Sequence, residues 1–335
     1  MENADKTYIA WGIDEGVHEA RDLKPMLTPE EQVELLKMKG VTFKRCGEKS
    51  AIQALASRDT YLHIAAFRKM FQRHEGGDKD GCYVDLDFAD LLYLDGLDAE
   101  IRRAFQLVSG DVERTAKAQL VAKIASHEGE DGYGILSDFM EAQSKAYRKS
   151  IERNLEARAD SSERADVYLG ALIEHYRAAL PVWVFVEVVP FGTLLAFMLF
   201  CAERWDDKEL RVLHYALTDV KAVRNCCSHG SCVINGFDDK QKTPFSTSSL
   251  VFDWLASQGV RNNAARRAKL ANRRMQQLVT TIAVFDQSVV FGYEAARASL
   301  ETLEASLRDC IGRYGIQNSF VSYLSFLANV IDRVG

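Results

Sequence analysis

Apolar residues recur every three or four positions along most of this chain, which is the period of an amphipathic α-helix. In the middle of the chain the repeating apolar positions are Ile101, Ala104, Phe105, Val108 and Val112, and the pattern continues toward Ile124. Near the end the same spacing gives Leu300, Leu303, Leu307 and Ile311, followed by Phe320, Leu324, Leu327 and Ile331. The pattern predicts an all-α protein without an internal repeat.

Local signals mark helix boundaries in the first part of the chain. Thr28-Pro29-Glu30-Glu31 has the form of a capping box with proline at the first helical position, and Gly40 would end that helix. A second helix is expected over residues 49–71. We therefore predict an N-terminal helical segment over residues 1–80 and a helical core with C-terminal helices over residues 81–335.

Three stretches depart from the amphipathic pattern. Residues 144–163 are charged on all sides and predict a solvated helix or a mobile insertion, and residues 235–249 predict a loop. Leu180–Cys201 carries a single charge, Glu187, and is long enough to cross a bilayer. Because Glu187 and Pro190 lie near its centre and no basic cluster flanks it, we predict a buried core helix, bent at Pro190, and no membrane association.

Composition narrows the possible environments and partners. The net charge of -6 argues against a broadly basic coat for nucleic acid, so any RNA contact must come from a local patch. The 7 cysteines form an odd set without framework spacing, and Met1–Asp22 is polar and acidic rather than a signal peptide. Reduced thiols in a cytoplasmic protein are the simplest interpretation.

One basic stretch stands out in this acidic chain. Its cationic residues, with no acid among them, are Arg261, Arg266, Arg267, Lys269, Arg273 and Arg274. They predict a phosphate-binding strip for RNA, which we call the basic strip. The alternative is a solvated helix face that pairs with acids elsewhere.

The candidate for chemistry is the hexapeptide Arg224-Asn225-Cys226-Cys227-Ser228-His229. Apolar residues precede it at helical spacing and Gly230 follows, so it should lie at the end of a buried helix with Asn225 and His229 on one face. Histidine can exchange protons with a ribose hydroxyl or a leaving oxygen near neutral pH, and arginine can hold a phosphate. The alternative is an ordinary helix end with polar residues.

A zinc site is a competing interpretation of the same region. Cys226, Cys227, His229 and Cys232 are four possible ligands within seven residues. Adjacent cysteines point in different directions, however, and no second ligand pair follows at the spacing of a zinc finger. We therefore predict no metal and no cofactor.

Three motifs together resemble the AbiD/AbiF-type abortive-infection proteins of the HEPN superfamily. Lys24-Pro25-Met26-Leu27-Thr28, with Glu31-Gln32 and Leu35-Leu36-Lys37, is similar to their N-terminal signature. A central segment contributes Trp183, Glu187, Phe191, Gly192, Thr193 and Leu194. Arg224-Asn225 and His229 match the R-N-x-x-x-H ribonuclease motif, and Asp98, Arg102 and Glu113 match a helix between the first two segments. One departure is His63, which stands where the family has arginine.

The resemblance implies an all-α HEPN-type helical bundle with N-terminal and C-terminal helical extensions. It implies a metal-independent endoribonuclease in which Arg224, Asn225 and His229 from two copies form the site of a homodimer that halts phage infection. Trp183, Glu113 and Glu187 would support the site. From its place in the apolar run, we also expect Glu187 to be the internal polar partner of that helix and to orient Arg224. RNA is the expected substrate, and a regulatory noncoding RNA is a further possible partner. The alternative is a non-cleaving HEPN scaffold that binds a structured RNA or a partner protein.

Overall fold

The computed structural model describes residues 25–238, 247–261, 263–315 and 319–334, and within these ranges the chain is all-α. Apart from two isolated β-bridges, the described residues form no β-structure. The α-helices are α1 (Pro29–Met38), α2 (Glu48–Ser57), α3 (Tyr61–Ile64), α4 (Phe88–Ser126), α5 (Gly134–Ala142), α6 (Lys145–Arg158), α7 (Gly170–His175), α8 (Val182–Val188), α9 (Phe191–Arg204), α10 (Lys208–Ser228), α11 (Ser249–Ser257), α12 (Ala264–Leu270), α13 (Arg273–Ser288), α14 (Glu294–Tyr314) and α15 (Ser319–Ile331). A 3-10 helix, η1 (Ala65–Met70), follows α3. The predicted all-α class is confirmed.

The chain separates into two compact units. The first comprises the residues up to Tyr61 together with Arg73–Phe88, and the second comprises Leu62–Gln72 and the chain from Ala89 onward. In the first unit the predicted capping box at Thr28 is present, because Thr28 and Glu31 exchange side-chain-to-backbone hydrogen bonds. Lys24 and most of the predicted loop over 235–249, namely residues 239–246, lie outside the described residues.

The helix expected over residues 49–71 is broken, so that prediction was wrong. α2 ends at Ser57, and the chain resumes helical structure as α3 and then as the tighter η1. At the break, the Asp59 carboxylate accepts a hydrogen bond from the N–H of Thr60 at 2.7 Å. A short side chain that bonds to nearby backbone competes with the helical hydrogen-bond pattern, which favours a turn at this position.

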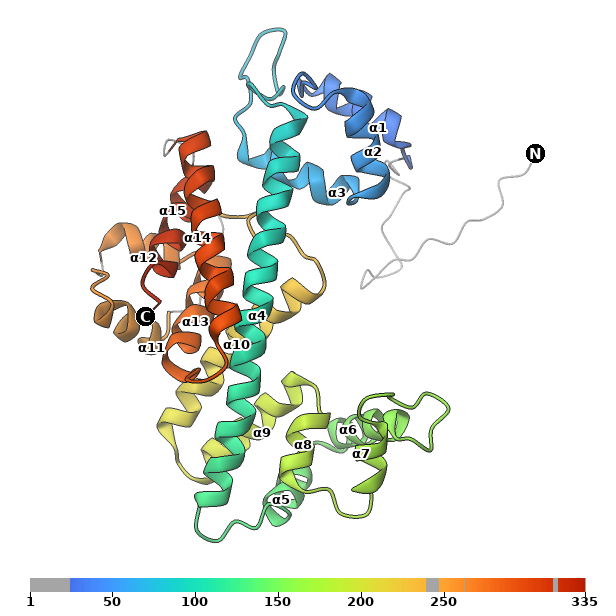
Figure 1. The fold of residues 1–335 in the computed structure, drawn as a ribbon, viewed down its shortest axis with the longest axis vertical. Helices are drawn as coiled ribbons and strands as arrows, with labels where there is room; N and C mark the ends of the chain where they lie inside the picture. The colour runs from blue at the N-terminus through green and yellow to red at the C-terminus, as the bar shows by residue number, and fades with distance from the viewer. Residues whose placement is uncertain (1–24, 239–246, 262, 316–318, 335) are drawn as a thin grey trace, which may run out of the picture. The chain divides into compact units, whose positions relative to one another are not determined.

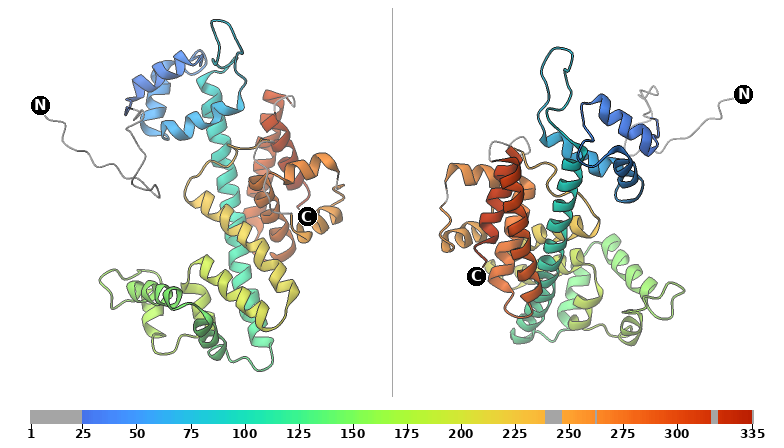
Figure 2. Two further views of the ribbon diagram at one scale, coloured as in Figure 1. Left: turned by 180° about the vertical axis from the view of Figure 1, so that it is seen from behind. Right: turned by 45° about the horizontal axis from the view of Figure 1, so that its top comes forward.

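The core of the second unit forms around α10, α13 and the C-terminal helix pair. α10 packs against α9 and α13, while α14 packs against α15 (Figure 1). Figure 2 shows from two further directions that α14 runs alongside the long helix α4. The fully buried side chains of this core include Leu217, Val220, Val279, Ile282, Leu324 and Leu327.

The apolar run from Leu180 to Cys201 is buried, but it forms two helices rather than one bent helix. α8 ends at Val188, and α9 begins after Pro190, which is its N-cap residue. Proline cannot donate the backbone hydrogen bond that a continuous helix needs, so the chain breaks there. Within the part of the chain that the structure describes, no helix has the length and apolar character needed to cross a membrane.

Candidate functional site

The hexapeptide lies at the C-terminal end of α10, as the sequence predicted. The helix begins at the N-cap Asp207, whose carboxylate accepts a hydrogen bond from the N–H of Leu210 at 2.9 Å. It ends at Ser228, and Gly230 follows with φ +66°, a conformation in which glycine carries little steric cost. The N–H of His229 still donates to the Asn225 carbonyl at 3.0 Å, which keeps these two residues on one turn.

Arg224 is held in place by two neighbours and remains partly accessible. Its Nε lies 3.6 Å from Oε2 of Glu113 on α4, and its Nη1 donates to Oδ1 of Asn225 at 3.3 Å. The Arg224 side chain is 38% exposed, whereas that of Glu113 is 15% exposed. The guanidinium therefore has a fixed acidic partner on one side and solvent on the other.

His229 is the exposed member of the group. Over the described residues, its imidazole makes no hydrogen bond and no ion pair. The two residues on either side of it are nevertheless held. The hydroxyl of Ser228 donates to Oε1 of Gln106 at 3.0 Å, and Nη1 of Arg102 donates to the Gly230 carbonyl at 3.5 Å.

The turn after Gly230 is organised by Asp98 of α4, which is fully buried. Oδ1 of Asp98 accepts hydrogen bonds from the backbone N–H groups of Val233 and Ile234, each at 2.8 Å. Oδ2 accepts from Nη1 of Arg102 at 2.5 Å. Burial raises the pKa of the Asp98 carboxyl, and the two N–H groups and the Arg102 charge oppose that rise.

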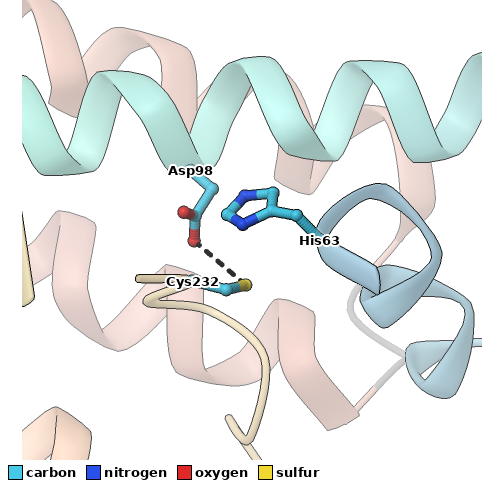
Figure 3. A group of neighbouring side chains, drawn as sticks. All are labelled: His63, Asp98 and Cys232. Carbon is cyan, nitrogen blue, oxygen red and sulfur yellow. Dashed lines mark hydrogen bonds between the residues drawn. The ribbon is translucent and has the colours of Figure 1, made fainter. Parts of the chain in front are cut away.

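His63, Asp98 and Cys232 come together from three separate segments (Figure 3). One possible ligand atom from each lies within 4.8 Å of the others, which is the arrangement a metal ion would need. Arg102 occupies the same neighbourhood, because its Nη1 contacts both Asp98 and Nε2 of His63, the latter at 3.2 Å. The guanidinium therefore already places a positive charge beside two of these three residues.

The four-ligand zinc set considered from the sequence does not assemble. Cys226, Cys227, His229 and Cys232 do not close on one point in the described ranges, where Cys232 groups instead with His63 and Asp98. Burial raises the pKa of the Cys227 thiol to about 12, and it raises the pKa of Cys226 and Cys232 as well. These thiols are therefore protonated at neutral pH, and a metal ion would have to displace that proton in order to bind them.

The expectation that Glu187 is an internal partner of Arg224 is wrong. Its side chain is 56% exposed, and it pairs with Lys117 of α4 at 3.5 Å. Lys117 in turn lies 3.8 Å from Oε1 of Glu113, so Glu187 reaches Arg224 only through two other charges. The ring of Trp183 is half-exposed and packs edge-on against Tyr133, and no contact among the described residues joins it to the hexapeptide.

The basic strip is divided between two helices, and part of it serves the fold. Arg273 pairs with the buried Asp219, and Lys269 lies over the ring of Tyr323 at 3.7 Å. Nη1 of Arg274 donates to the carbonyls of Cys232 and Val233 at 2.9 and 3.1 Å. Arg261 and Arg267 are exposed, and Arg266 donates to the Arg261 carbonyl at 2.6 Å.

Sequence reasoning missed Gln106 as a partner of the hexapeptide and Arg274 as a partner of the turn that follows it. Gln106 could have been found, because it follows Asp98 and Arg102 at intervals of four on α4, and residues four apart share a helix face. Arg274 carried no such signal, since the sequence grouped it with the other cations of the basic strip.

A comparison with models of protein families found one match that covers the candidate site. Residues 55–235, more than half of the chain, match the model of a family described as Abi-like protein. The matched range contains the hexapeptide and the α4 residues that contact it. Comparison with curated proteins found no match, and comparison with solved structures found none either.

Proposed function

Because the chain belongs to the Abi-like protein family, which associates it with abortive-infection defence, we propose that it is an endoribonuclease of the HEPN type. Arg224, Asn225 and His229 carry the reaction, which needs no metal ion. The observation that supports this assignment is that two groups suited to the reaction lie at the end of one helix. The His229 imidazole is exposed and makes no hydrogen bond or ion pair over the described residues, and the partly exposed Arg224 guanidinium is held by Glu113 and Asn225.

The proposed reaction is an internal phosphoryl transfer. The ribose 2′-oxygen attacks the adjacent phosphorus and loses its proton to a base, while the bond from phosphorus to the 5′-oxygen breaks and that oxygen takes a proton from an acid. The products are a 2′,3′-cyclic phosphate and a 5′-hydroxyl, so atoms and protons balance. His229 exchanges the proton, and Arg224 stabilises the charge that develops on the phosphate oxygens.

One copy of the hexapeptide supplies one histidine, whereas the reaction uses a base on one side of the phosphorus and an acid on the other. A two-fold symmetric dimer repeats every interface residue and would bring two copies of His229 to one phosphate. We therefore propose that the active form is a homodimer that acts on RNA in the cytoplasm. Asn225 would orient Arg224 through the hydrogen bond to its guanidinium.

The exposed cations of the basic strip are the proposed RNA-backbone contacts. Arg261 and Arg267 have exposed side chains, whereas Arg273 and Arg274 make structural contacts that are only partly exposed. Reversing Arg261 and Arg267 to Glu should weaken RNA binding and reduce its salt dependence, with little change in melting temperature. Unchanged RNA affinity at low salt would remove the strip from the proposal.

The test of the activity compares wild type with His229→Ala and Arg224→Ala on total RNA and on defined oligonucleotides. Cleavage in wild type should persist with excess chelator, leave cyclic-phosphate ends, and disappear in both variants while their circular dichroism is unchanged. His214→Gln on the same helix is a matched histidine control, because His214 is buried away from the hexapeptide. Cleavage by a folded His229→Ala protein would refute the assignment, and RNA that is bound but never cut by wild type would favour the non-cleaving scaffold.

A further inference from the structure

The two residues that flank His229 are both held by a single face of α4. Gln106 accepts a hydrogen bond from Ser228, the residue before His229, and Arg102 donates to the carbonyl of Gly230, the residue after it. Gln106 and Arg102 are four residues apart on α4, so their side chains project from the same face. The imidazole between these two contacts makes none of its own over the described residues.

The chain just beyond Gly230 is held through hydrogen bonds to both its backbone N–H groups and its backbone carbonyls. Asp98 accepts hydrogen bonds from the N–H groups of Val233 and Ile234. Arg274 from α13 donates to the carbonyls of Cys232 and Val233. Side chains therefore satisfy both the N–H and the C=O of Val233, in a segment that has no helix or sheet to do so. Asp98, Arg102, Gln106 and Arg274 together form what we call the polar clamp.

We propose that the polar clamp positions His229 for proton transfer, which makes Arg102 and Gln106 positioning residues; this inference rests on the proposed ribonuclease function. His229 follows the last helical residue, and helix ends fray when nothing holds them. A clamp that fixes the Ser228 side chain and the Gly230 carbonyl limits where the imidazole can travel, and it leaves both ring nitrogens free. Proton transfer depends steeply on such positioning, since a displacement of about 1 Å can lower a rate on the order of 100-fold.

A clamp that served folding alone would give a different result from a clamp that positions His229. Loss of a purely structural contact lowers the fraction of active protein and leaves the kinetic constants of the folded fraction unchanged. Loss of a positioning contact lowers kcat, because the imidazole is misplaced in the transition state, and leaves KM for RNA nearly unchanged. The contact between Gln106 and Ser228 is best suited to separate the two, since both residues are exposed and their truncation leaves no buried group unpaired.

The kinetic test is a double-mutant cycle of Gln106→Ala, Ser228→Ala and the double variant. If the hydrogen bond positions His229, each single change should lower kcat about three- to tenfold, and the double change should lower it no further. KM should stay within about twofold, and Ser228→Thr, which keeps the hydroxyl, should restore most of the rate. Arg103→Ala is the matched control on α4, because Arg103 is exposed and makes no hydrogen bond or ion pair among the described residues. Additive losses in the double variant, or a raised KM with unchanged kcat, would overturn the inference.

A measurement that does not depend on cleavage separates this inference from the proposed function. Amide hydrogen exchange of the segment 226–234 should accelerate in Gln106→Ala and stay at the wild-type rate in Arg103→Ala, with both melting temperatures unchanged. If wild type cuts no RNA, the proposed function fails, while the exchange result still shows whether the clamp holds the chain at His229. Unaltered exchange in Gln106→Ala would overturn the clamp itself, whatever the activity.

Discussion

Asp98→Ala should be among the most destabilising single substitutions in the second unit. Asp98 is 0% exposed and accepts two backbone N–H groups as well as the guanidinium of Arg102, whose side chain is only 13% exposed. Alanine would leave all three donors without this acceptor. The loss differs from that of an ordinary surface ion pair, because buried donors cannot recover their hydrogen bonds from bulk water.

The expected magnitude follows from these contacts. Each buried donor left unsatisfied costs about 1–3 kcal/mol, and removing one partner of a buried ion pair costs about 3–5 kcal/mol. These values overlap rather than add, and water entering the space left by the carboxylate would satisfy part of the requirement. We expect a loss of about 3–5 kcal/mol, which is a large fraction of the stability of a typical domain.

Urea unfolding followed by circular dichroism measures this loss directly. Asp98→Asn keeps an acceptor oxygen for the two N–H groups while removing the charge, so it should cost clearly less than Asp98→Ala. Asp253→Ala, an exposed aspartate on α11, should change stability by less than about 0.5 kcal/mol. A loss below about 1 kcal/mol in Asp98→Ala, or equal losses in the alanine and asparagine variants, would refute the account of Asp98 as the organiser of this turn.

Three further predictions follow from buried polar groups. Burial lowers the pKa of the His214 imidazole in the folded protein, so as pH falls the unfolded chain is protonated at a higher pH than the folded one. The free energy of unfolding should therefore decrease as pH drops below about 6.5. His214→Leu should flatten that part of a profile of stability against pH. The buried Asn272 donates to the Gly236 and Asp238 carbonyls and caps α13. Asn272→Ala should therefore lower the free energy of unfolding, measured in urea, by about 2–3 kcal/mol. A decrease below about 0.5 kcal/mol would contradict this role. With its pKa raised to about 12, Cys227 should react with iodoacetamide at pH 7.5 far more slowly in the folded protein than in urea, as measured by mass spectrometry.

The sequence predicted the long helices α4, α10, α14 and α15 because their apolar spacing is regular. It also predicted the end of α10, because Gly230 is a local signal that needs no knowledge of distant residues. The break at Asp59 was missed, since its cause is a hydrogen bond between a side chain and the next peptide that the apolar pattern does not register. Glu187 was misplaced for a related reason: a single charge in an apolar run suggested burial, but helix α8 turns that position toward solvent and Lys117.

The roles of the cations were the least predictable part of the candidate site. Arg273 and Arg274 lie next to each other in sequence and next to exposed cations, yet one pairs with a buried carboxylate and the other holds a turn near the hexapeptide. Which role each adopts depends on where α10 places Asp219 and where the turn after α10 places its carbonyls. That information is tertiary, and neither composition nor spacing contains it.

Helix α4 also restricts where this protein can tolerate a change of length. Asp98, Arg102, Gln106 and Glu113 follow one another at intervals of four, four and seven residues along a helix of 39 residues. Inserting a single residue between Gln106 and Glu113 would rotate the two ends by about 100° and carry Glu113 away from Arg224. Inserting seven residues would restore the angle to within about 20° but move the ends roughly 10 Å apart along the axis. The helix therefore fixes both the angle and the distance between its site residues. Insertions that preserve the site must fall outside the interval from Asp98 to Glu113.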